Sequence, residues 1–126
     1  MDTSIDWGNL PFGYYPTDYN VRCEFRNGQW GPIEVSQSDT INIHMAATSL
    51  HYGQEIFEGL KAFRGKDGKI RIFRLEENAK RLQESAKGLL MEPVPVEIFK
   101  EMCLKAVKLN ERFIPPYGSG ASLYIR

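Results

Sequence analysis

Two apolar stripes in the second half of the chain constrain its fold more than any other feature. In the first stripe, leucine and alanine recur at alternating four- and three-residue steps, which places them on one face of a helix. Pro93 and Pro95 end that helix and open the next, whose apolar residues keep the same period. The sequence therefore predicts two consecutive amphipathic helices. Their stripes are Leu75, Ala79, Leu82, Ala86 and Leu89, then Phe99, Met102, Cys103, Ala106 and Val107.

Short strands are expected around an Asn-Gly pair near the N-terminus. Val21–Arg26 alternates apolar and polar residues, and a second run covers Trp30–Val35. Asn27-Gly28 lies between them, and Asn-Gly favours a type I′ turn because both central residues of that turn need positive φ. We therefore expect a hairpin here. Ile41–His44 also alternates and is predicted to be a strand.

A second hairpin and a last strand complete the expected elements. The hairpin is predicted to have residues 54–63 as its first strand, residues 64–69 as its turn and Ile70–Phe73 as its second strand. The last strand of the chain is expected to begin near Ala121. Because strands and helices are segregated along the chain, the pattern favours an α+β fold: a mostly antiparallel sheet with two consecutive helices packed on it. We expect an irregular arm over residues 1–20 and one small domain over residues 21–126.

Composition favours a packed domain in a reducing compartment. The 126 residues are 42% hydrophobic, and sixteen basic residues balance sixteen acidic ones, so nucleic-acid binding has no electrostatic support. No stretch approaches the roughly 20 apolar residues of a membrane helix, and the N-terminus has no apolar signal region. Cys23 and Cys103 show no metal-ligand spacing, so we expect reduced thiols, no metal site and a cytoplasmic location.

Taken alone, the polar residues do not identify a reaction. His44 and His51 have no cysteine or paired acid nearby and are interpreted as ordinary surface or core residues. Glu55 and Glu58 would share a face of a helix but point to opposite sides of a strand, so a catalytic carboxylate pair stays open. Lys61 is expected on a solvated strand face. No glycine-rich phosphate loop is present.

A longer motif carries a family resemblance. Residues 50–63 read L-H-Y-G-Q-E-I-F-E-G-L-K-A-F, and Ile72–Leu75, Asn78–Leu82 and Ser122–Arg126 follow in order. These segments resemble the branched-chain amino acid aminotransferases of pyridoxal-phosphate (PLP) fold type IV, and they match the small N-terminal domain of that family. The arm, with Phe12-Gly13, is similar to that of its longer-armed members.

The resemblance implies that Arg81 binds the phosphate of the cofactor, PLP. A guanidinium group is always charged, and its planar fork can bind two phosphate oxygens at once. Without the resemblance, Arg81 would be interpreted as a solvated helix residue.

The resemblance also implies residues on the substrate side. Phe57 and Gly59 are expected to line the pocket, with an aromatic wall for a branched side chain and a close backbone approach. Tyr124 and Arg126 are expected to accommodate both an apolar side chain and the distal carboxylate of glutamate. The resemblance further implies that Tyr52 reaches a neighbour's active site across a dimer interface and that Phe12 closes over the substrate.

The implied reaction is amino transfer between leucine, isoleucine or valine and 2-oxoglutarate, which yields glutamate. PLP acts as the electron sink, and the lysine that forms its Schiff base belongs to the family's larger C-terminal domain. Because Ser122–Arg126 reads as an unfinished strand, we expect a fragment truncated before that domain. Without the lysine of that domain, the fragment is expected to be inactive and to have no catalytic residue of its own. The full-length protein is expected to form a homodimer or a larger homo-oligomer.

Other functions stay open on the sequence. Within fold type IV, the chain could come from a D-amino acid aminotransferase or an aminodeoxychorismate lyase. A non-catalytic binding module that reuses the same domain is the alternative from another functional class.

Overall fold

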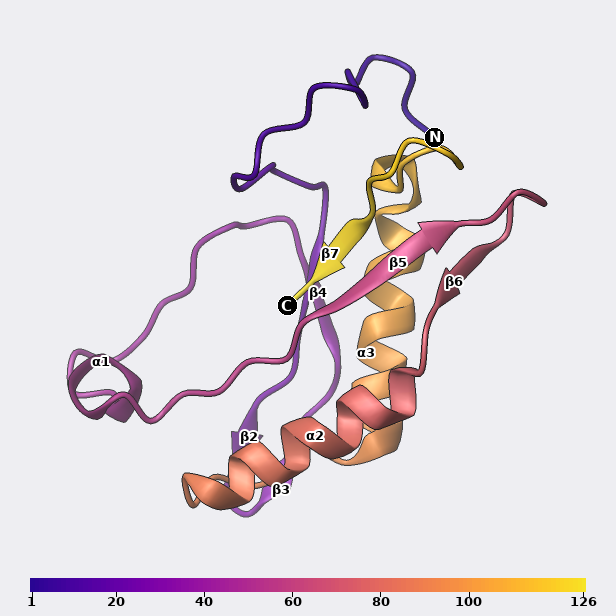
Figure 1. Cartoon of the computed structure of the whole chain (residues 1–126). Coiled ribbons are helices and arrows are strands. Elements are labelled where there is room, and N and C mark those ends of the chain that lie inside the picture. Colours follow the sequence, from indigo (N-terminus) through magenta and orange to yellow (C-terminus); the bar gives the residue numbers. More distant parts are fainter.

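The computed structural model describes residues 1–126 and has an α+β fold (Figure 1). All its strand pairs are antiparallel, and two long helices follow one another, so the predicted fold class is confirmed. The strands form three small sheets rather than one. The elements are β1 (Asn20–Arg22), β2 (Phe25–Arg26), β3 (Gln29–Trp30), β4 (Glu34–Ser36), α1 (Thr48–Tyr52), β5 (Leu60–Arg64), β6 (Ile70–Ile72), α2 (Leu75–Gly88), α3 (Val96–Leu109), the 3₁₀ turn η1 (Glu111–Phe113) and β7 (Leu123–Ile125).

The first hairpin turns at Asn27-Gly28, as predicted. Asn27 has a φ of 53° and Gly28 a φ of 79°, the positive values that a type I′ turn requires. Strands β2 and β3 leave this turn with Phe25 opposite Trp30, whose ring centroids lie 5.2 Å apart. Farther from the turn, β1 pairs with β4, so one long ribbon runs antiparallel over both pairs.

The predicted strand over Ile41–His44 is wrong. This segment is irregular, the Ile41 and Ile43 side chains are exposed, and the segment belongs to none of the three sheets. Alternating residues form a strand only where another strand accepts and donates their backbone hydrogen bonds. The second hairpin also begins later than expected: residues 54–59 are extended without a ladder, and β5 starts at Leu60.

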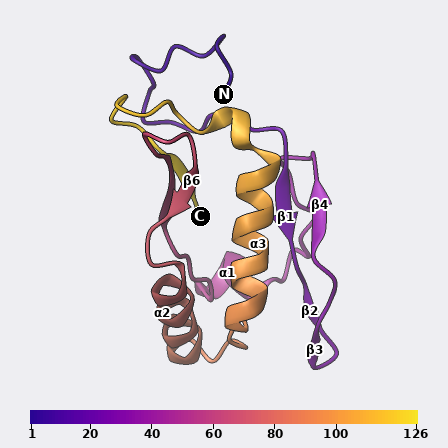
Figure 2. The same cartoon turned by 90° about the vertical axis from the view of Figure 1, so that its right-hand side faces the viewer.

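Helix α3 lies between the two main β layers. Figure 2 shows it with the three-stranded sheet on one side and the ribbon of β1 and β4 on the other. The strand order of that sheet is β6-β5-β7. Helix α2 crosses below the sheet, and the arm passes over its opposite end (Figure 1). None of the helices combines the length and apolarity needed to cross a bilayer.

The core fills the space between the inner face of the sheet and the helices. Leu60 packs with Phe99 and Cys103, and Ala62 packs with Val107 and Ile114. Burying a large apolar side chain contributes roughly 1.5–3 kcal/mol. Burial also raises the pKa of the Cys103 thiol to about 11, which keeps it protonated. Only 12 of 126 residues are buried, so much of the outer sheet face is left open.

Candidate functional site

The candidate site lies where α2 meets the outer face of the sheet. Side chains alternate in residues 57–63: Glu58, Leu60 and Ala62 are buried, whereas Lys61 and Phe63 face outward. Lys61 lies opposite Tyr124 on β7, so both side chains emerge on the same face. A hollow of about 760 Å³, the first hollow, opens there. Its lining includes three of the predicted site residues, Gly59, Arg81 and Tyr124.

Gly59 allows Tyr124 to lie against the backbone. A Cβ at position 59 would lie 2.5 Å from the Tyr124 hydroxyl oxygen and 3.0 Å from Cε2 of the ring. Any larger residue would therefore push the ring aside. The absence of a side chain at position 59 thus fixes how near the tyrosine comes to β5.

Arg81 is held by a carboxylate from the segment before β5. Its Nε donates to Glu58 Oε2 at 2.8 Å and to Oε1 at 3.1 Å, and Nη2 also donates to Oε1. Asn78, one turn earlier on α2, donates to the same Oε1 at 3.1 Å. The Glu58 side chain is 5% exposed and the Arg81 side chain 67% exposed. The hydrogen bonds from Arg81 are the main reason that the pKa of Glu58 is lowered.

Positive charge predominates around the first hollow. Lys61, Arg74, Lys80 and Arg81 line it, against two carboxylates. Glu77 is paired with Lys80 at 3.4 Å and Arg81 is paired with Glu58, so Lys61 and Arg74 are the lining cations without an ion pair. The lining therefore favours an anionic ligand.

A second hollow of about 810 Å³ lies between the arm and β7. Its walls are mostly apolar and include Phe12, while Arg126 adds a cation. Lys61 and Tyr124 line both hollows, so the two are adjacent across one strand pair. This arrangement can receive an apolar group beside an anionic one.

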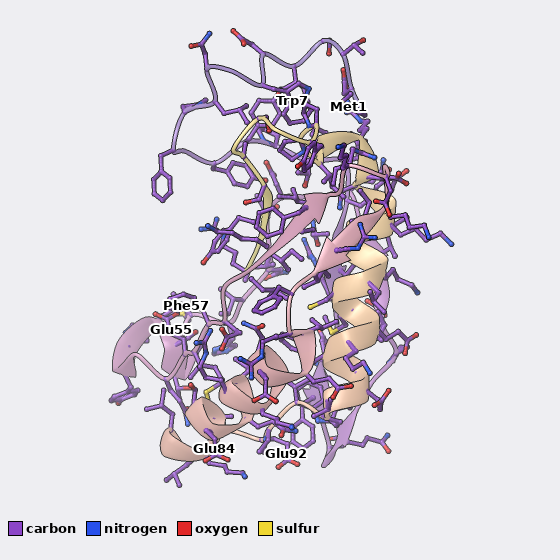
Figure 3. All side chains as sticks on the ribbon, turned by 45° about the vertical axis from the view of Figure 1, so that its right-hand side comes forward. Met1, Trp7, Glu55, Phe57, Glu84 and Glu92 are labelled. Carbon is purple, nitrogen blue, oxygen red and sulfur yellow. The ribbon has the colours of Figure 1, made fainter.

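Phe57 and Tyr52 lie outside both hollows. Phe57 is 78% exposed, because the inward position next to it is taken by Glu58. Figure 3 shows Phe57 beside Glu55 near α1, far from Trp7 on the arm. Tyr52 is the last residue of α1 and is also exposed. The structure of this chain therefore does not join these two residues to the others.

Sequence reasoning overlooked Glu58, Asn78 and Lys61 as members of the site. One signal for Glu58 was available: it precedes Leu60 and Ala62 at two-residue steps, so it falls on the buried face of an extended segment. A carboxylate in such a position needs a charged or hydrogen-bonding partner. Asn78 and Arg81, three residues apart, supply that partner from one face of α2.

Comparison with known proteins finds close relatives along nearly the whole chain. It is 48% identical to the branched-chain-amino-acid aminotransferase of Haemophilus influenzae over 97% of its own length and 36% of the relative's. It is 44% identical to the enzyme of the same name from Helicobacter pylori, over 98% of its own length and 36% of the relative's. It is 45% identical to chloroplastic branched-chain-amino-acid aminotransferase 5 of Arabidopsis thaliana, over 97% of its own length and 29% of the relative's. No protein-family model matches. The chain thus spans about a third of the length of these relatives.

Proposed function

The chain belongs to the branched-chain amino acid aminotransferase family, and we propose that it supplies the phosphate-binding arginine and one wall of the active site in such an enzyme. The whole enzyme would exchange amino groups between leucine, isoleucine or valine and 2-oxoglutarate. The observation that carries the proposal is the convergence of Arg81, Gly59 and Tyr124 on one positively charged hollow.

The residues around the first hollow suit PLP. Nη1 of Arg81 has no hydrogen-bond partner within the chain, so it is available to a phosphate oxygen. Gly59, which has no side chain, lets the Tyr124 ring lie close to the backbone at one side of this hollow. When bound, PLP would supply the electron sink for the reaction. This chain's part would be to hold the phosphate and to close one side of the site.

The second hollow suits the substrates. Its apolar wall would receive a branched aliphatic side chain, which gains roughly 1.5–3 kcal/mol on leaving water. Arg126 and the Tyr124 hydroxyl would meet the distal carboxylate of glutamate, with Phe12 covering the opening. Phe57 and Tyr52 would contribute only together with surfaces from outside this chain: Phe57 on the substrate side, and Tyr52 at a neighbour's site in a homodimer.

The remaining parts of the enzyme would come from outside residues 1–126. We place there the large domain and the lysine that holds the cofactor, because the relatives are about three times as long as this chain. The chain alone would therefore not catalyse amino transfer. The buried, protonated thiol of Cys103 fits the reducing, cytoplasmic location that we propose for the enzyme.

Cofactor binding can be tested with pyridoxine phosphate, which has the phosphate but not the aldehyde of PLP. We expect its addition to shift the backbone amide signals of Gly59, Arg81 and Tyr124 together in NMR spectra. The shifts should disappear in Arg81→Gln and persist in Arg71→Gln, since Arg71 pairs with Asp67 and lies outside the hollow. Equal shifts in both variants, or equal shifts with unphosphorylated pyridoxine, would contradict the proposed role of Arg81.

The absence of the cofactor lysine is tested separately. The purified chain is mixed with an equimolar amount of PLP, treated with borohydride and digested for mass spectrometry. We expect no lysine to carry the cofactor in appreciable yield. A single lysine modified close to stoichiometrically would show that the chain holds the cofactor covalently by itself.

A further inference from the structure

The buried carboxylate of Glu58 has no role in the function proposed above. It lies before β5, whereas Arg81 lies on α2, so their contact joins two elements that are 23 residues apart in the chain. The pair is asymmetric, because Glu58 is almost fully buried and most of the Arg81 side chain is exposed. An exposed arginine would otherwise sample many rotamers.

The contact uses one edge of the guanidinium and leaves the other free. Nε and Nη2 donate to the two oxygens of Glu58, whereas Nη1 donates to no group of this chain. Asn78 holds the same carboxylate from α2, at 3.1 Å, so the carboxylate itself cannot turn freely. A guanidinium has five N–H donors in a fixed plane, so fixing the Nε edge also fixes the direction of the Nη1 edge.

We propose that Glu58 is a positioning residue, which holds the Nε edge of Arg81 and so presents its Nη1 edge to an anion in the first hollow. The anion is a phosphate group, whether free or attached to a cofactor. This inference rests on the proposed function, in which Arg81 binds phosphate. It adds that Glu58 directs the arginine without contacting the phosphate.

Charge alone would assign Glu58 the opposite effect. A carboxylate beside the arginine repels a phosphate and partly neutralises the cation, so by charge alone its removal would strengthen phosphate affinity. Loss of positioning would weaken that affinity, so the two effects oppose each other. Affinity is therefore a poor test. A better test is which nitrogen of the Arg81 guanidinium the phosphate binds, because Coulomb repulsion does not determine that nitrogen.

The experiment follows the side-chain N–H signals of Arg81 by NMR in the 126-residue chain, with inorganic phosphate as the probe. In the unaltered chain we expect phosphate to shift the Nη signals and to leave the Nε–H signal in place. In Glu58→Ala, Nε–H should exchange with water roughly 10-fold faster or more, since charge-assisted hydrogen bonds are lost, and it should shift with phosphate. Glu55→Ala is the matched control, because Glu55 is exposed and has no hydrogen bond through its side chain.

Each outcome has a distinct meaning. Unchanged Nε–H exchange in Glu58→Ala, or an Nε–H shift with phosphate in the unaltered chain, would overturn the positioning role and leave phosphate binding by Arg81 intact. No response of any Arg81 signal in the unaltered chain would overturn phosphate binding as well. If Glu58→Ala does not fold, Glu58→Gln keeps the side-chain size and one acceptor, and we expect it to show the same effects to a smaller extent.

Discussion

At the scale of single residues, Asn110 joins the base of the N-terminal arm to the end of helix α3. Asn110 directly follows the end of α3, and the residue is 4% exposed in a chain where few residues are buried. Oδ1 accepts from the backbone N–H of Asp18 and of Tyr19, each at 3.1 Å. Nδ2 donates to the carbonyl of Tyr19 at 3.0 Å and to that of Ala106 at 2.8 Å. Each hydrogen-bonding atom of this amide therefore has two partners.

Replacing Asn110 with alanine should destabilise the chain by about 1–3 kcal/mol, because part-buried backbone groups lose their partners. The change in unfolding free energy can be measured by urea denaturation. The amides of Asp18 and Tyr19 should also lose protection from hydrogen exchange. Asn42→Ala is the control, since Asn42 is exposed and makes no hydrogen bond through its side chain; an equal loss in both variants would contradict this account.

At the scale of elements, the C-terminus of α2 ends with an unusual residue. The N–H of Met91 donates to the carbonyl of Ala86, and that of Leu90 to the carbonyl of Lys87, which is the Schellman pattern. The residue with left-handed backbone in this pattern is normally glycine, but here it is Leu90, with a φ of 57°. Leu90 is also 91% exposed, so it gains little from packing in this chain.

Leu90→Gly should therefore stabilise the chain, against the usual direction of a leucine-to-glycine change. Relief of the left-handed conformation contributes about 1–2 kcal/mol, and the greater freedom of glycine in the unfolded chain offsets roughly 0.5–1 kcal/mol of it. Thermal or urea unfolding should reveal the gain. The neighbouring variant Leu89→Gly should be destabilised instead, because Leu89 has a φ of −108°. A loss of stability in both variants would sink the prediction.

The two long helices and the first turn were predictable because local chemistry determines them. The stripe from Leu75 to Ala86 and the Asn27-Gly28 pair each specify a structure without reference to distant residues. The strand predicted at Ile41–His44 failed because a strand also depends on a partner elsewhere in the chain. Elements with long-range requirements were thus the ones misassigned or placed at the wrong boundary.

At the scale of the whole molecule, the candidate site was only partly predictable for the same reason. The resemblance supplied Arg81, Gly59 and Tyr124, which the fold brings to one hollow. It could not show that Glu58 holds Arg81, because that contact depends on how α2 crosses the sheet. Nor could it show that Phe57 is left exposed by the elements of this chain.

The arm is also attached by charged groups, at Asp18 near its base and at Asp2 near its N-terminus. Arg112 donates to Asp18 through Nε at 2.6 Å and Nη2 at 2.7 Å, and through Nη1 to Asp2. Its guanidinium also lies 4.1 Å from the ring centroid of Phe113. The backbone N–H of Asp2 reports this attachment, since it donates to the carbonyl of Arg112 at 2.9 Å. The second hollow, which the arm encloses, therefore depends on these contacts.

Release of the arm should depend on pH with a definite sign. Hydrogen bonds from Arg112 lower the pKa of Asp18 below its ordinary value of 3.8, and hydrogen bonds from Ser4 contribute most to the lowered pKa of Asp2. A lowered pKa means that the attachment is complete above pH 3.8 and is lost as the pH falls through the pKa of the folded chain. Hydrogen exchange of the Asp2 backbone N–H should therefore stay slow near neutral pH and accelerate in acid, beyond the intrinsic pH dependence of exchange. In Arg112→Gln this N–H should exchange several-fold faster already at neutral pH, and the acceleration in acid, the acid step, should disappear. The control is Arg26→Gln, which breaks an exposed ion pair on the first hairpin and should leave both the neutral rate and the acid step unchanged. An acid step that persists in Arg112→Gln would mean that the carboxylates of Asp2 and Asp18 hold the arm through some other group.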